Sequence, residues 1–205
     1  MTKAHRALLD LVRERTGPTH PNYTALLRAR DDVRAMAHVL GVRGVDPDSS
    51  DLEGSTILHQ PDVSYGVVQL MLAAGADPDA RWYGGHGRTP LYFATVPGVP
   101  TLLYEAGADL EHRDVSGLTP LLFNIQYGAV DMVDELLGLG ADDAVHDDAG
   151  LDLFDYANRV PTQAIAEQLA AILQRHRVLR AQTRREGLIA VIRPRLRQCE
   201  PQRHL

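Results

Sequence analysis

The chain has 205 residues, of which 44 % are hydrophobic and 23 % charged, a balance that excludes wholesale disorder. No apolar run approaches the roughly 20 residues of a membrane-spanning helix, and the opening stretch MTKAHRALLDLVRERTG is too interrupted by charge for a secretory signal. The single cysteine, Cys199, allows no internal disulfide, which favours a reducing, cytoplasmic compartment.

Charge is unevenly distributed along the chain. Residues 175–205 contain nine arginines and two glutamates, a formal charge of +7, whereas residues 1–174 carry 12 basic and 25 acidic groups, a charge of −13. Lys3 is the single lysine. This arginine bias, with abundant Ala, Gly, Val and Leu, indicates GC-rich coding and hence a bacterial source. An acidic body with a basic tail is therefore a feature that the function has to explain.

A Gly-x-Asp word follows an apolar run four times. It begins at Gly44, Gly75, Gly107 and Gly140, so that successive copies are 31, 32 and 33 residues apart. Glycine after an apolar helical run supplies the left-handed residue that ends a helix. We therefore expect one helix to end just before each of these glycines.

A second word marks helix starts at Thr24, Thr56, Thr89 and Thr119, with a weaker copy at Asp152. These starts are 32, 33, 30 and 33 residues apart. Threonine caps helix N-termini, and the proline that follows Thr89 and Thr119 is preorganised for the first helical turn. Each repeat is predicted to hold two short amphipathic helices and an extended loop, and neither helix can bury its apolar face without neighbours.

Residues 114–142, with Thr119-Pro120-Leu121, Gly128-Ala129-Val130 and Gly140-Ala141-Asp142, resemble the ankyrin consensus closely. The resemblance extends over about residues 20–174 and implies an all-α fold, an ankyrin-repeat solenoid of about five helical pairs. Three copies are clear, and we number them one to three: 51–80, 84–112 and 114–146. Two flanking copies, 20–46 and 147–174, are degenerate, as terminal repeats that face water are expected to be.

The spacing also predicts the domain limits and one irregularity. We expect an N-terminal helix or cap over residues 1–19, the repeat domain over 20–174 and a basic helical extension over 175–205. From threonine to the next Gly-x-Asp glycine, copies one to three span 19, 18 and 21 residues, and only copy three has the full family spacing. Copy two contains Pro97-Gly98-Val99-Pro100, which predicts a compressed turn between its two helices.

The chemistry-bearing residues favour structural roles. In the ankyrin family, the position of His59 is one where the imidazole joins neighbouring loops by hydrogen bonds. The nine histidines are scattered without metal-ligand spacing, and Gly84-Gly85-His86-Gly87 lacks the Lys-Ser/Thr of a phosphate-binding loop. Asp142-Asp143 and Asp147-Asp148 are not followed by the spacing of a calcium loop. We expect no enzyme activity, no metal site and no cofactor.

The resemblance implies that a partner docks on the concave face, which loop tips and first helices form. The loop 81–88 is the most informative candidate. It holds the only tryptophan, Trp82, beside Tyr83 and Arg81, and Trp, Tyr and Arg are the residue types most enriched in binding hot spots. The alternative is that Trp82 folds back as packing. The candidate residues are Leu52, Glu53, Ser55, Arg81, Trp82, Tyr83, His86, Arg88, Tyr92, Val115, Ser116, Leu118, Gln126, Tyr127, Asp148, Leu151, Asn158 and Arg159.

The stretch Thr162–Gln182 is predicted to be helical. One apolar stripe runs along it, formed by Ile165, Leu169, Ile172, His176 and Leu179. This helix either closes the end of the repeats as a cap or serves as a dimerisation or partner helix. The apolar run Leu188–Ile192 must likewise cover the end of the repeats or a partner.

Three functions agree with these patterns. The first is a cytoplasmic protein-binding scaffold, an inhibitor or immunity-type protein that masks a bacterial enzyme or toxin; its acidic body favours a partner with a basic surface. The second is a nucleic-acid-associated regulator that uses Arg193, Arg195 and Arg197 in the tail. The third is a structural protein that self-associates through its C-terminal helix. No membrane partner is expected.

Overall fold

The computed structural model describes residues 21–42 and 44–198, with side chains described as far as residue 186. The helices, in chain order, are α2 (Pro21–Ala29), α3 (Val33–Leu40), η1 (Ile57–His59), α4 (Tyr65–Ala73), η2 (Pro90–Tyr92), α5 (Val99–Glu105), α6 (Pro120–Gln126), α7 (Val130–Leu139), α8 (Leu153–Ala157) and α9 (Gln163–Gln198). Within the described ranges no strand forms, and β-pairing is limited to one bridge between Trp82 and Arg88. The predicted all-α class is confirmed. The cap expected over residues 1–19 and Cys199 lie outside the described residues.

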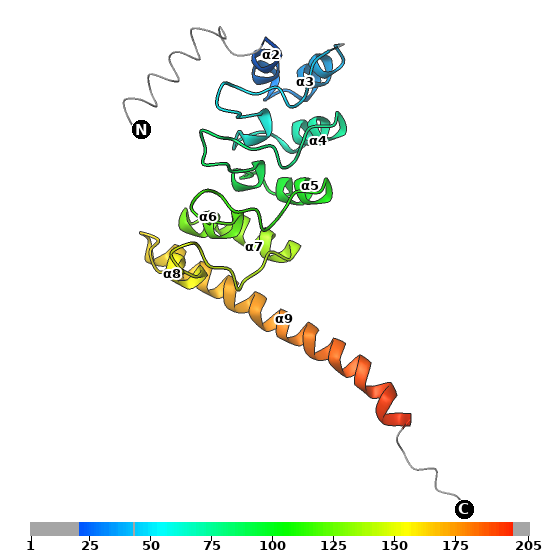
Figure 1. The fold of residues 1–205 in the computed structure, drawn as a ribbon, viewed down its shortest axis with the longest axis vertical. Helices are drawn as coiled ribbons and strands as arrows, with labels where there is room; N and C mark the ends of the chain where they lie inside the picture. Colours follow the sequence, from blue (N-terminus) through cyan, green and yellow to red (C-terminus); the bar gives the residue numbers. More distant parts are fainter. Residues whose placement is uncertain (1–20, 43, 199–205) are drawn as a thin grey trace, which may run out of the picture.

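The helices form two rows that run along the molecule (Figure 1). The first row consists of α2, η1, η2, α6 and α8; the second consists of α3, α4, α5, α7 and the beginning of α9, and neighbours within each row contact one another. One apolar core extends through every pair and includes Leu26, Met36, Ile57, Met71, Leu91, Leu103, Leu122, Leu136 and Leu153. This arrangement follows from helices that are too short to bury an apolar face alone.

Glycine ends the second helix of each clear copy, as predicted. Gly75, Gly107 and Gly140 have φ angles of 94°, 105° and 108°, a left-handed conformation that a side chain would strain. The amide of the following residue donates back to the helix: Ala76 N lies 3.0 Å from Met71 O. The same bond recurs in the other two copies, so the repeated glycines end the helices by one shared motif.

The first helices of the three clear copies differ in length, which bears on the predicted compression of the turn in copy two. In copies one and two they are three-residue 3₁₀ turns, η1 and η2, whereas α6 in copy three has seven residues. Thr119 caps α6 by accepting a hydrogen bond from Leu122 N at 3.3 Å. In copy two, residues 93–98 leave ample room between η2 and α5. Relative to copy three, the shorter spacing of copy two falls on both of its helices, since α5 has seven residues and α7 has ten. The predicted compression of the turn is wrong.

Carboxylates join consecutive copies along the edge where the Gly-x-Asp turns lie. In each case a backbone amide of the next turn donates to the carboxylate: Asp77 N to Asp48 at 2.8 Å, Asp109 N to Asp79 at 3.0 Å and Asp142 N to Glu111 at 2.7 Å. Burial is the largest cause that raises the pKa of both Asp48 and Glu111. The next equivalent position is Ala144, which has no carboxylate, so the series ends at copy three.

Helix α9 covers the C-terminal end of the two rows, where α7 and α8 lie. Leu169 and Leu173 are buried against the core, with exposures of 0 % and 2 %, and α9 contacts both α7 and α8. Arg180 donates to Asp143 at 2.8 Å and to the carbonyl of Ala141. Hydrogen bonds from Arg175 and His176 hold the pKa of Asp134 below its ordinary value. The first part of α9 is thus packed as the predicted cap would be.

The second part of α9 leaves the body of the molecule (Figure 1). Val178 and Leu179 are about half exposed, and residues 181–186 are exposed. The helical backbone continues through Gly187 and Pro194 to Gln198. The change of charge near residue 175 therefore falls inside one continuous helix.

Candidate functional site

Three of the four loops that precede first-row helices are built around one aspartate each. Asp51, Asp114 and Asp147 occupy the same position, and each carboxylate accepts hydrogen bonds from the amides two and four residues later, at 2.7–3.0 Å. Such side-chain-to-backbone bonds hold a tight turn without help from outside it. These loops therefore present their tips in a fixed conformation.

The loop formed by residues 81–88 is built differently. It has no aspartate at the equivalent position, and the carbonyl of Trp82 accepts from Gly85 N and Gly87 N at 3.1 and 2.9 Å. Trp82 N in turn donates to Arg88 O at 2.9 Å. Backbone bonds thus replace the carboxylate. Neighbouring loops are joined to it, because Tyr83 N donates to Glu53 O at 2.9 Å and Val115 N donates to His86 O at 3.1 Å.

His59 joins η1 to both ends of the next loop, where the family position implied a hydrogen bond between neighbouring loops. Its Nε2–H lies 3.0 Å from Ala80 O and 3.2 Å from Arg88 O, while Nδ1 accepts from Thr56 N at 3.1 Å. Both ring nitrogens are used by the neutral imidazole. Burial lowers the pKa of His59 below its ordinary value of 6.5, although the two carbonyls and Asp51 oppose the shift.

We predict that stability falls in mildly acid solution because of His59. Its pKa is lower in the folded chain than in the unfolded chain, so below about pH 6.5 the unfolded chain binds the extra proton and the stabilisation is lost as the pH falls. Urea unfolding should give a smaller free energy at about pH 5.5 than at about pH 7.5. His59→Gln should reduce this difference; an unchanged difference in the variant would remove His59 as the cause.

Trp82 packs inward, which is the second of the two readings of this residue. Its ring centroid lies 5.4 Å from that of Phe93 and 6.3 Å from that of His59. Gly85 lies against the indole so closely that a Cβ there would be 2.3 Å from Trp82 Cε3. The side chain is half-buried, and its indole nitrogen is a buried atom for which the described residues supply no hydrogen-bond partner. Trp82 therefore supports the loop and exposes only part of its ring.

Trp82→Ala should lower the free energy of unfolding by about 2 kcal/mol, less than the loss for a fully buried tryptophan. The neighbouring Tyr83 is 78 % exposed, so Tyr83→Ala should change stability by no more than about 0.5 kcal/mol. Urea denaturation of both variants measures the difference. Equal stabilities would contradict the inward packing of Trp82.

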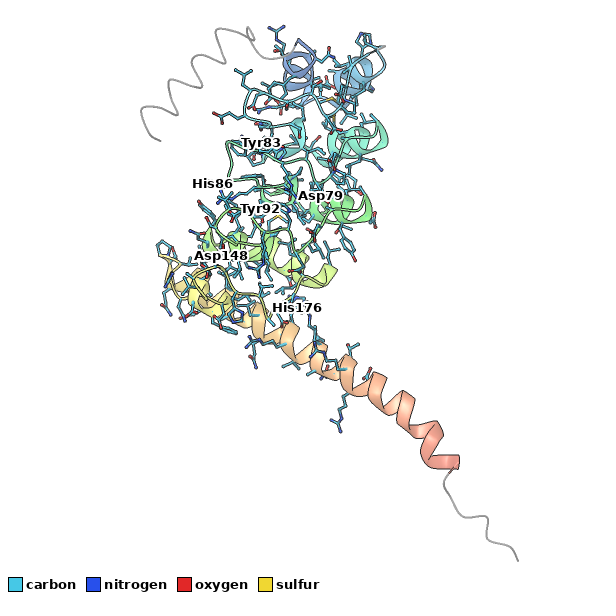
Figure 2. The ribbon with its side chains drawn as sticks, viewed as in Figure 1. Asp79, Tyr83, His86, Tyr92, Asp148 and His176 are labelled. Carbon is cyan, nitrogen blue, oxygen red and sulfur yellow. The ribbon has the colours of Figure 1, made fainter. Side chains whose placement is uncertain are left out.

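Two predicted contact residues belong to the core instead. Tyr92 and Leu118 are buried, so the expectation that they face a partner is wrong. The hydroxyl of Tyr92 lies 2.6 Å from the carbonyl oxygens of His112 and Leu118, and burial raises its pKa. Its place inside the molecule is visible in Figure 2. Tyr92, the fourth residue of its Thr-led word, thus points at the loop that follows it, as the equivalent His59 does one copy earlier.

The remaining candidates reach the surface to different extents. Tyr83, His86 and Asp148 lie along the edge formed by the loop tips (Figure 2). Leu52, Glu53 and Leu151 are half-buried. Ser55 is buried, so the expectation that it faces a partner is wrong as well. Val115 and Tyr127 are 70 % and 68 % exposed. The other exposed candidates are Arg81, Ser116, Gln126, Asn158 and Arg159.

A row of partly exposed rings runs from the loop before copy two through copies two and three, on the first-row side. We call it the aromatic strip and define it as Trp82, Phe93, Phe123 and Tyr127; successive ring centroids are 5.4, 5.8 and 4.7 Å apart. Phe93 and Phe123 were absent from the predicted contacts. Both stand four residues after the threonine of their copy, so comparison of that position between repeats was the signal for finding them.

The surroundings of the strip differ in charge from the rest of the body. Residues 21–174 contain eight arginines and 23 acidic residues, a formal charge of −15. Residues 80–104, which include Trp82 and Phe93, contain two arginines and no acidic residue. The strip is therefore bordered by a stretch without carboxylates in an otherwise acidic molecule.

Other kinds of site were also sought. Within the described residues no three His, Cys, Asp or Glu side chains are grouped so that they could hold a metal ion. None of the described helices has the length and apolar character needed to cross a membrane.

Comparison with known proteins gives partial matches. No protein-family model matches the chain. Over 94 residues, 44 % of the chain, it is 36 % identical to the E3 ubiquitin-protein ligase KEG of Arabidopsis thaliana, of which it covers 6 %. Over 73 residues, 36 % of the chain, it is 38 % identical to a putative ankyrin repeat protein of Pyrobaculum aerophilum, of which it covers 26 %. These similarities point to the ankyrin-repeat family, the family that residues 114–142 resemble.

Proposed function

We propose that this chain is a non-catalytic protein-binding scaffold, an ankyrin-repeat solenoid with about five helical pairs over residues 20–174. Its partner binds across the first row and the loop tips. The observation that carries the proposal is the aromatic strip, in which Tyr127 is largely exposed, together with the exposed Tyr83 and Val115 beside it. Partly exposed aromatic side chains held by rigid loops provide contact area with little loss of conformational entropy on binding.

The charge supports a protein partner with a basic surface. A body with 23 acidic residues and eight arginines attracts such a surface over long distances and raises its association rate. Together with the bacterial composition and a cytoplasmic location, this favours an inhibitor or immunity-type protein that masks a bacterial enzyme or toxin.

A binding measurement with matched variants tests the proposal. The partner is first captured from the cytoplasm of the source organism on immobilised protein, then purified. Tyr127→Ala should weaken its binding at least about tenfold, or about 1.4 kcal/mol. Tyr104→Ala is the control, because Tyr104 is exposed on α5 in the second row. Equal affinities for the two variants would place the partner elsewhere.

Helix α9 favours two other candidate functions. One is self-association through the tail, and the other is nucleic-acid binding through the tail. Arg175, Arg177 and Arg180 pair with Asp134 and Asp143 of the same chain. The exposed Arg184 and Arg185 follow, where the helix has left the body (Figure 1).

Two measurements distinguish these alternatives. A dimer in sedimentation equilibrium that dissociates in Arg184→Gln/Arg185→Gln would support self-association. A DNA or RNA mobility shift that weakens steeply with salt and requires the same arginines would support nucleic-acid binding. A monomer that binds neither at low salt would end both.

A further inference from the structure

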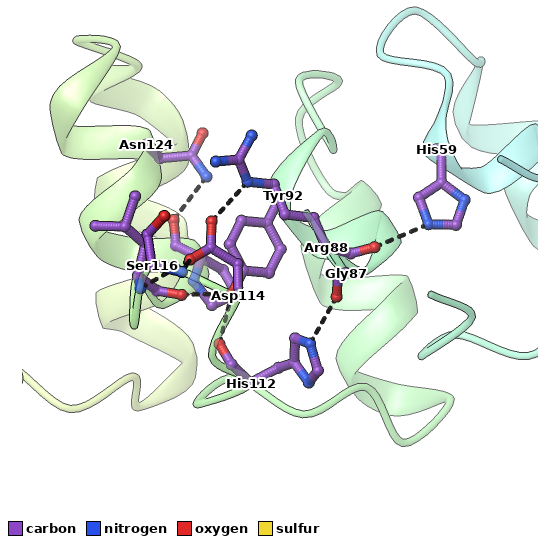
Figure 3. Close-up of polar contacts among 10 residues, drawn as sticks. His59, Gly87, Arg88, Tyr92, His112, Asp114, Ser116 and Asn124 are labelled. Atoms are coloured by element: carbon purple, nitrogen blue, oxygen red, sulfur yellow. Dashed lines mark hydrogen bonds and ion pairs between the residues drawn. The ribbon is translucent and has the colours of Figure 1, made fainter. Parts of the chain in front are cut away.

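Arg88 is held in place from several directions. Its Nε donates to Asp114 Oδ2 at 2.8 Å (Figure 3). Its guanidinium lies 4.5 Å from the ring centroid of Phe123. The Asp114 side chain is fully buried, and its other oxygen accepts from two loop amides. The backbone of Arg88 is fixed as well, since its carbonyl accepts from Trp82 N and His59 Nε2. This arginine has lost most of its side-chain freedom before any partner binds.

One edge of the guanidinium remains open. Nη1 and Nη2 have no acceptor among the described residues, and Figure 3 shows the guanidinium joined to Asp114 through Nε. Neither nitrogen is among the buried polar atoms that lack a partner, so both reach solvent. Two terminal nitrogens of a planar guanidinium donate parallel hydrogen bonds that match the two oxygens of a carboxylate.

Resting on the proposed function, we infer that Arg88 anchors an aspartate or glutamate side chain of the bound partner. The aromatic strip receives the apolar residues on either side of that carboxylate. Phe123, under the guanidinium, has Phe93 on one side at 5.8 Å and Tyr127 on the other at 4.7 Å. A bound segment therefore continues past Arg88 in both directions, which selects a side chain within the segment over a chain end.

Charge makes this position selective. Residues 80–104 contain no carboxylate, and Asp114, which pairs with Arg88 Nε, is buried, whereas the body as a whole carries −15 and repels acidic groups elsewhere. A partner with a basic surface is attracted by the acidic body at long range. If that partner also carries one acidic residue beside apolar side chains, this residue can pair with Arg88 at the local site.

Random peptides displayed on phage and selected against the immobilised chain provide the probe. Enriched sequences are synthesised with blocked termini as pairs that differ by Glu and Gln, or Asp and Asn. Binding is followed by the fluorescence of Trp82, the only tryptophan. The acidic peptide should bind at least about tenfold more tightly than its amide twin. Arg88→Lys should reduce the ratio to near one, whereas Arg81→Lys, at an exposed arginine of the same loop, should preserve it.

A second readout keeps the inference testable if Arg88→Lys fails to fold. In the unaltered chain labelled with ¹⁵N-arginine, the Nη resonances of Arg88 should shift with the acidic peptide and stay in place with its twin. Equal binding of the twins, or an unaltered ratio in folded Arg88→Lys, overturns the inference and leaves the proposed function standing. Failure of every peptide to bind this surface overturns both.

Discussion

Asp114→Ala is expected to lower the free energy of unfolding by about 3–5 kcal/mol. The side chain is fully buried and accepts from Arg88 Nε at 2.8 Å, Ser116 N at 2.8 Å and Leu118 N at 3.0 Å. Alanine leaves two loop amides without their acceptor. It also leaves the guanidinium of Arg88, whose side chain is only 17 % exposed, without a counter-charge.

Urea denaturation measures this loss, with Asp62→Ala as the matched control because Asp62 is exposed. Asp114→Asn should lose less than Asp114→Ala, since its amide oxygen still accepts from the two loop amides while the charge is absent. A loss for Asp114→Ala within about 1 kcal/mol of the control would mean that the pair contributes no more than a surface ion pair.

Leu169→Ala is expected to cost about 2–5 kcal/mol, because the beginning of α9 is part of the core. Leu169 is fully buried, on the face of α9 that contacts α7 and α8. Removal of its side chain leaves a cavity at the end of the two rows. In a repeat architecture the loss falls first on the last pair, since each pair is stabilised chiefly by its neighbours.

The matched control is Leu179→Ala on the same helix, where the side chain is 50 % exposed. It should change stability by less than about 1 kcal/mol. Thermal unfolding of both variants compares the two positions. If the two variants are equally stable, α9 does not close the repeats as its packing indicates.

The sequence predicted the features that depend on local backbone conformation. Gly75, Gly107 and Gly140 end helices because a left-handed residue is required there, and a local requirement is visible in a single chain. Pro90 and Pro120 stand at helix starts for the same kind of reason. The stripe that begins with Ile165 predicted the buried Leu169, since helical spacing repeats on one face, but it missed the buried Leu173 and included the half-exposed Leu179.

Features that depend on contacts between repeats were not predicted. Whether Trp82 faces a partner or packs on Phe93 depends on a neighbouring copy, and residue type alone favours neither. Tyr92 was predicted at the surface, but its polar hydroxyl finds hydrogen-bond acceptors inside the molecule. Those acceptors are the carbonyls of His112 and Leu118, which come from the next loop and are not visible in a local pattern. The length of η2 likewise depends on how copy two packs, which its spacing of 18 residues does not specify.

The pair of Arg88 and Asp114 shows the same limit at the candidate site. The two residues are 26 positions apart and belong to loops of different copies, so no local pattern joins them. The sequence predicted Arg88 as a contact residue by its type and its loop. The contacts with Asp114 and Phe123 add what the sequence did not predict, a fixed guanidinium with one open edge.

Hydrogen–deuterium exchange with and without the captured partner tests most directly whether binding takes place on the first-row side. Slower exchange is expected in the complex for amides of residues 82–93 and 115–127, which carry the aromatic strip and its loops. Amides of α4 and α5 in the second row should exchange at unchanged rates. Protection confined to α3, α4 and α5, or to α9, would contradict the proposal that the partner binds across the first row.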